Sequence, residues 1–112
     1  MGAEVHNVEA DQGGTEQFIV GVRESDGEPS DLTGYSGEMQ VWSSYEADAT
    51  LLVTGSVSIN AALGLVTVTV DGDDTLAATW RSGVYDVKIV VGAESPEYIA
   101  RGTYKLRPTV TR

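Results

Sequence analysis

The chain has no cysteine, a single histidine and three prolines among its 112 residues. Without cysteine there can be no structural disulfide, thiolate zinc site, iron–sulfur ligand or cysteine nucleophile. A chain without cysteine is compatible with both oxidising and reducing compartments. No stretch approaches the roughly 18 apolar residues of a membrane span, and the N-terminus lacks the basic and apolar regions of a signal peptide. We therefore expect no membrane insertion and a mature chain that begins near Met1.

Basic residues are also scarce, and they are unevenly spread. Residues 1–80 hold fourteen of the seventeen acids and one base, Arg23, whereas residues 81–112 hold six bases and three acids. The formal net charge of −10 argues against a nucleic-acid partner, because affinity for the phosphate backbone depends on Lys and Arg. The last third of the chain is nevertheless locally positive.

Long helical patterns are missing as well, and short alternating runs of apolar residues are separated by Gly, Asp, Asn and Ser. The length fits one domain, and 41% apolar residues can build its core without a structural metal or disulfides. We expect an all-β, immunoglobulin-like antiparallel β-sandwich of about seven or eight strands, with a small closed barrel as the alternative. Residues 1–14 are expected to form an N-terminal arm or edge strand, and residues 15–112 the sandwich domain.

The clearest strands lie in two predicted hairpins. One joins SVSIN to LVTVTV through residues 61–64, and the other joins residues 84–91 to residues 97–107. One short helical turn is predicted near residues 73–80, capped by Asp73 or Asp74. Strict alternation along the last strand places one set inward, namely Tyr98, Ala100, Gly102, Tyr104 and Leu106. It places the other set outward, namely Ile99, Arg101, Thr103, Lys105 and Arg107.

Several short segments together carry a resemblance. They are DLTGY at residues 31–35, LVTVTV at 65–70, TLAA at 75–78, SGVYDVKIV at 82–90 and RGTYKL at 101–106. This series resembles the β-sandwich domain at the N-terminus of baseplate upper proteins and related small tail or fibre-attachment proteins of tailed bacteriophages. The resemblance implies a domain that fastens fibres or receptor-binding modules to a particle and has no catalytic residues.

The chain departs from that family in its strongly acidic N-terminal segment and in having no fibre-like, collagen-like or coiled-coil extension after Arg112. We expect it to bind its cargo as a separate chain.

Residues with chemical potential are few. His6 lies in a polar stretch without a neighbouring serine or carboxylate motif, and we expect a solvated side chain. The acids Asp71, Asp73 and Asp74 either bind Ca²⁺ or form a helix cap and a solvated turn, since the distal glutamate of an EF-hand loop is missing. The aromatic residues Trp42, Tyr45 and Trp80 form either a sugar platform or core and interface filler. We expect no enzyme and no cofactor.

A candidate interface follows from the outward side of the last strand. Arg101, Lys105 and Arg107 would form a basic stripe on an otherwise acidic domain, which suits packing between subunits. Their alternative is pairing within the chain, with Glu38 or Asp86. Trp42 and Ile99 are added to the interface because both are predicted on polar faces, and exposed large apolar groups tend to mark contacts.

These observations, with the resemblance, predict a non-enzymatic virion structural protein of a tailed bacteriophage. It would be a tail, baseplate or fibre-adaptor subunit that assembles in the host cytoplasm and packs as a homo-oligomer or against other virion subunits. A capsid decoration or head–tail joining protein is one alternative. A carbohydrate-binding module is another.

Overall fold

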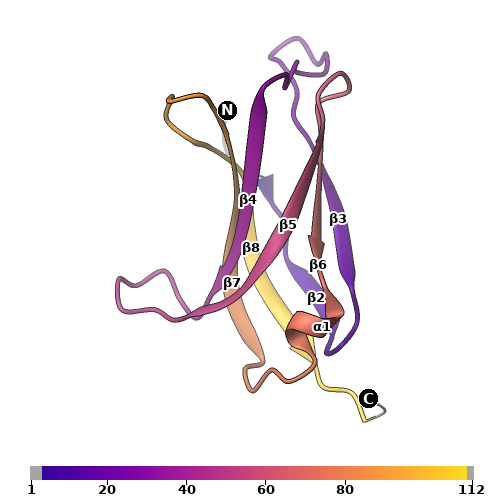
Figure 1. Ribbon diagram of the computed structural model, residues 1–112, viewed down its shortest axis with the longest axis vertical. Helices are drawn as coiled ribbons and strands as arrows, with labels where there is room; N and C mark the ends of the chain where they lie inside the picture. The colour runs from indigo at the N-terminus through magenta and orange to yellow at the C-terminus, as the bar shows by residue number, and fades with distance from the viewer. Residues whose placement is uncertain (1–3, 111–112) are drawn as a thin grey trace.

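The structure is a computed structural model that describes residues 4–110 (Figure 1). Its elements are β1 (Glu4–Val5), β2 (Val8–Asp11), β3 (Glu16–Gly21), β4 (Tyr35–Trp42), β5 (Leu51–Asn60), β6 (Leu65–Val70), α1 (Gly72–Thr75), β7 (Ser82–Val91) and β8 (Glu97–Arg107). The strands pair in the order β1-β8-β7-β4-β5-β6-β3, and β2 also pairs with β8. The predicted all-β fold, with about eight strands and one short helix, is confirmed.

This sheet curls on itself, so that its two ends face each other as two layers. Figure 1 shows β4, β7 and β8 on one side and β6 and β3 on the other, with β5 crossing obliquely between them. The first half of β5 pairs with β4, through Val53 beside Val41, and its second half pairs with β6, through Val57 beside Val68. β5 is thus the corner of the fold.

Gly55 marks this corner. A Cβ there would lie 2.9 Å from the sulfur of Met39 and 3.0 Å from the carbonyl oxygen of Thr69, so a larger residue would crowd both layers at once. Glycine at a sheet corner is expected where backbone approaches this closely. The predicted hairpin of β5 and β6 follows it, closed by a turn in which Gly64 has a φ of +63°.

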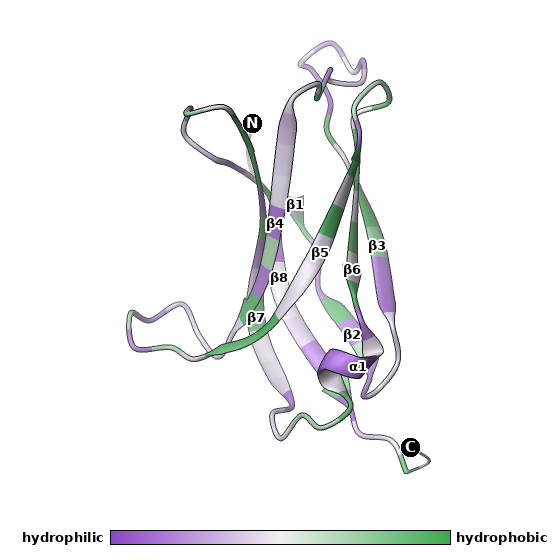
Figure 2. Ribbon diagram, in the orientation of Figure 1, coloured by the Kyte–Doolittle hydropathy of each residue, from purple (hydrophilic) through white to green (hydrophobic). Residues whose placement is uncertain are grey.

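The core lies between the layers and is built by alternation. Figure 2 shows hydrophobic and hydrophilic residues interspersed along the strands and a hydrophilic α1. Along most of the strands every second residue points inward, as a pleated strand with one covered face requires. The largest fully buried side chains are Tyr85, Tyr104, Met39, Ile89, Val41, Val66, Val68, Val70, Val87 and Thr75.

The N-terminal segment differs from the antiparallel expectation. β1 and β2 both run parallel to β8, with Glu4 beside Ala100 and Val8 beside Tyr104. Val8 and Ala10 are buried in the core, so these short strands extend the sheet at its edge. Parallel pairing is possible here because the two partners lie at opposite ends of the chain and need no tight connection.

The helix also differs in its start. Asp71 is the N-cap, and its carboxylate accepts a hydrogen bond from the Asp73 backbone N–H at 2.9 Å. The prediction that Asp73 or Asp74 is the cap is wrong, because both lie in the first turn itself. No helix in the described part of the chain is long and apolar enough to cross a membrane.

Candidate functional site

The candidate site is the outward side of β4, β7 and β8, here called the outer face. Cross-strand register aligns its side chains in rows, one of which contains Gln40, Asp86 and Arg101. The next row contains Trp42, Val84 and Thr103, and the row on the other side contains Glu38, Lys88 and Tyr98. The outer face is completed by Ser36, Ser82, Val90, Lys105 and Arg107.

A β-bulge corrects two predictions on β8. The pairing with β7 shifts between Val87 and Lys88, so that Val87 is beside Ala100 while Lys88 is beside Tyr98. Ile99 is the extra residue, and it turns inward with an exposed fraction of 4%. The prediction that Ile99 is exposed is therefore wrong, and so is the inward placement of Tyr98, which is 48% exposed. A bulge breaks strict alternation in this way.

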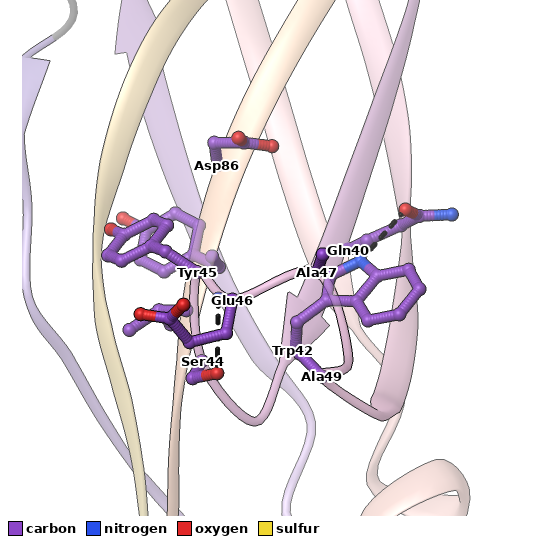
Figure 3. Close-up of a pocket in the computed structure, with 10 residues that line it drawn as sticks. Gln40, Trp42, Ser44, Tyr45, Glu46, Ala47, Ala49 and Asp86 are labelled. Atoms are coloured by element: carbon purple, nitrogen blue, oxygen red, sulfur yellow. Dashed lines mark hydrogen bonds between the residues drawn. The ribbon is translucent and has the colours of Figure 1, made fainter.

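A pocket of about 300 Å³ opens on the outer face beside the loop of residues 43–50. Its lining comprises Gln40, Trp42, Ser44, Tyr45, Glu46, Ala47, Ala49, Val84, Tyr85 and Asp86. In Figure 3 the rings of Trp42 and Tyr45 stand on opposite sides of the space, with the Asp86 carboxylate between and above them. The volume is at the lower end of the range for small-molecule sites.

Local hydrogen bonds hold this pocket in shape. The Trp42 indole N–H donates to Oε1 of Gln40 at 3.1 Å, and the Glu46 backbone N–H donates to Oγ of Ser44 at 3.2 Å (Figure 3). The loop is closed where the Ser43 N–H donates to the Thr50 carbonyl at 2.9 Å. Tyr45 is thereby carried next to the sheet although it lies in no strand.

The charge in and around the pocket is unbalanced. Asp86 takes part in no ion pair among residues 4–110, whereas Lys88 pairs with Glu38 at 3.4 Å. Burial raises the pKa of the Asp86 carboxyl above its usual value, and the nearby Lys88 offsets this in part. Together with Glu46, the pocket therefore presents two carboxylates and the exposed rings of Trp42 and Tyr45. This combination suits a cation or a polyhydroxylated ring with an apolar face.

The predicted basic stripe is partly neutralised. Arg107 pairs with Glu9 at 3.0 Å and with Asp11 at 2.9 Å, and these hydrogen-bonded carboxylates raise the pKa of its guanidinium. These two partners lie on β2. The partners predicted from the sequence were Glu38 and Asp86. Arg101 and Lys105 are exposed and form no ion pair with any residue that the structure describes.

The other candidates are placed elsewhere. The exposed His6 lies with its ring centroid 5.0 Å from that of Phe18, and its carbonyl accepts a hydrogen bond from the Tyr85 hydroxyl. Trp80 packs against the core, 6.2 Å from the ring of Tyr104, and does not line the pocket with Trp42 and Tyr45. Asp71 serves as the helix cap, and within residues 4–110 no group of three or more His, Cys, Asp or Glu side chains could hold a metal ion.

Sequence reasoning missed the part that Asp86, Glu46 and Tyr98 play at the site. Asp86 and Tyr98 are aligned with Trp42 and Arg101 only by the register of β4, β7 and β8, and Glu46 depends on the path of a loop. The alternation of β7 was the one available signal, since it turns Asp86 outward.

Comparison with known proteins identifies no family for this chain. No protein-family model and no curated protein matches the chain. One similar solved chain comes from a structure on T cell specificity and activation by the bacterial superantigen toxic shock syndrome toxin-1. It aligns over 90% of this chain and 92% of its own length, with 16% identity and a TM-score of 0.48.

Proposed function

We propose that the protein is a non-enzymatic structural subunit of a tailed-bacteriophage virion, in the tail, the baseplate or a fibre adaptor. It acts by packing its outer face against neighbouring subunits. The motifs from residue 31 to residue 106 support the phage assignment through their resemblance to tail and baseplate domains. The distribution of exposed apolar side chains supports the mode of action.

That distribution is the observation that carries the proposal. Nine large apolar side chains are exposed among residues 4–110, and five of them gather on or beside the outer face. Trp42 and Tyr98 belong to the outer face, and Tyr45 lines the adjoining pocket. Val5 is the cross-strand neighbour of Arg101, and Leu51 is that of Trp42. Exposed apolar groups that gather on one face among polar side chains are typical of protein contacts.

The test is where the chain is found on virus particles. Antibodies against the purified chain, applied to particles of the virus that encodes it, are expected to label the tail or baseplate in electron micrographs. Label on the capsid would favour a decoration or head–tail joining role instead. Absence of the chain from purified particles by mass spectrometry would overturn the proposal.

A matched pair of variants tests the outer face itself. Trp42→Asp places a charge on it, whereas Leu63→Asp changes another exposed apolar residue, in the turn between β5 and β6. Trp42→Asp is expected to fold and to be missing from particles, and Leu63→Asp is expected to be incorporated normally. Equal incorporation of both would show that the outer face makes no essential contact.

A further inference from the structure

The outer face is self-complementary in charge, which is unusual for this protein. β4, β7 and β8 together carry three acids and four bases, whereas the whole chain has a formal net charge of −10. Two copies of the chain repel each other through almost any other pair of surfaces, because like charges disfavour close approach. Repulsion between these strands of two copies is therefore weaker than the net charge of the whole chain implies.

The row of Gln40, Asp86 and Arg101 gives this complementarity a geometry. β7 is the middle of the three strands, so Asp86 lies at the centre of the row, with Gln40 and Arg101 about 5 Å to either side. A two-fold axis parallel to the strands and above β7 places β8 of one copy over β4 of the other. Arg101 of each copy then faces Gln40 of its partner. The two Asp86 side chains face each other across the axis, and one Arg101 approaches them from each side, about 5 Å away along the row.

The pocket provides what an arginine side chain requires. Trp42 and Tyr45 offer ring faces on which a guanidinium can stack, and the Asp86 and Glu46 carboxylates accept its N–H groups. Asp86 has no ion-pair partner within its own chain among the described residues, and neither has Arg101. Packed sheets are about 10 Å apart, a gap that an extended arginine side chain can bridge.

We infer that a second copy of this chain docks on the outer face, with its Arg101 in the pocket formed by Trp42, Tyr45 and Asp86. The contact is isologous, because each copy gives one arginine and one pocket. This inference rests on the proposed function only in taking the outer face as a protein contact. It adds the identity of the partner and the residue that enters the pocket.

Solution mass tests the inference, measured by light scattering on a sizing column over a range of protein concentrations. The wild-type chain is expected to form a concentration-dependent dimer. Arg101→Glu and Asp86→Lys are each expected to weaken the dimer by at least about tenfold, since each places like charges opposite one another. The control is Arg23→Glu, which makes the same charge change as Arg101→Glu but lies outside β4, β7 and β8. It is expected to dimerise as the wild type does.

Mixing the two variants gives the sharpest outcome. In a heterodimer of Arg101→Glu with Asp86→Lys, one contact joins the two introduced side chains, whose charges are opposite, and the other keeps the native Arg101 and Asp86. The mixture is therefore expected to dimerise although neither variant does so alone. Thermal unfolding followed by circular dichroism checks that each variant is folded, and Arg101→Gln replaces Arg101→Glu if the latter does not fold.

Three results would overturn the inference. One is a wild-type chain that stays monomeric at every concentration, and another is a dimer that persists in Arg101→Glu. The third is a mixture that remains monomeric. Saturable binding of a neutral disaccharide by a monomeric wild type, lost in Trp42→Ala, would assign the pocket to a glycan instead. If the purified chain is monomeric but antibodies against it still label the phage tail, this inference fails and the proposed function stands.

Discussion

Replacing Tyr104 by phenylalanine is expected to stabilise the fold, whereas the same change at Tyr85 is expected to destabilise it. Both rings are buried in the core, with exposed fractions of 0% and 1%, and they contact each other edge to face at 6.4 Å. Their hydroxyl groups differ. That of Tyr85 donates to the carbonyl of His6, and that of Tyr104 has no hydrogen-bond partner among residues 4–110.

The magnitudes follow from the cost of an unmade hydrogen bond. A buried hydroxyl without a partner costs about 1–3 kcal/mol, so Tyr104→Phe is expected to raise the free energy of unfolding by about 1 kcal/mol after the small void is counted. Tyr85→Phe removes a hydrogen bond and leaves the His6 carbonyl without this donor, and is expected to lower that free energy by about 1–2 kcal/mol. The two variants should differ by about 2–3 kcal/mol.

Urea denaturation followed by circular dichroism measures both values at one pH and temperature. Because the two substitutions are chemically identical and lie in one cluster of aromatic rings, each serves as the control for the other. A loss of stability in Tyr104→Phe equal to that in Tyr85→Phe would refute the reasoning, since it would mean that the Tyr104 hydroxyl is as well satisfied as that of Tyr85.

Alkaline pH is expected to unfold the protein, since burial raises the pKa of Tyr104 from 10.0 to about 12. Burial also raises the pKa of Tyr85. Stability is then complete below pH 10 and falls by about 1.4 kcal/mol per pH unit for each tyrosine as pH rises from there to the folded pKa. Tyrosinate absorbance that corresponds to all five tyrosines near pH 10, before any unfolding, would contradict this, since Tyr85 and Tyr104 would then ionise in the folded protein. Gly102→Ala is expected to cost about 1–3 kcal/mol and to speed amide exchange in β1, because a Cβ there would overlap the His6 carbonyl oxygen. Gly21→Ala, whose Cβ meets only Leu65 at 3.9 Å, is its control, and equal effects of the two would refute the overlap.

The alternation of the strands could be predicted from the sequence because it is a local property. The inward set of β4, with Met39 and Val41, follows from a period of two residues, and so does that of β6, with Val66 and Val68. The β5–β6 hairpin could be predicted for the same reason, since its two strands are joined by a short turn. Neither needs knowledge of a distant partner.

Features set by distant contacts could not be predicted in this way. The inward turn of Ile99 depends on where β8 slips against β7, which no pattern within β8 records. The start of α1 depends on Thr15, whose hydroxyl accepts from the Gly72 N–H at 3.0 Å, and on Thr75, whose hydroxyl accepts from the Gly13 N–H at 3.0 Å. The sequence favoured Asp73 or Asp74 as the cap, and these contacts instead start the helix directly after Asp71.

The candidate site was predicted in part. Trp42 and Arg101 were placed on the correct side, because β4 keeps its alternation throughout and β8 regains it after the bulge. The pocket beside them needs Tyr45 and Glu46, which a loop supplies. The ion pairs of Arg107 with Glu9 and Asp11 of β2 could not be predicted either, since they require strands from the two ends of the chain to be neighbours.

That neighbourhood of the first and last strands affects how the chain folds as it is synthesised. Arg107 and Asp11, which are joined by a hydrogen bond of 2.9 Å, are separated by 96 positions. β2 therefore leaves the ribosome long before its partner exists, and its buried residues Val8 and Ala10 have no sheet to join until β8 follows. Closing a loop of this length costs about 4 kcal/mol of chain entropy. The sheet is thus completed only after β8 has been synthesised, and the high sequence separation of its contacts makes folding slower than that of a helical domain of equal size.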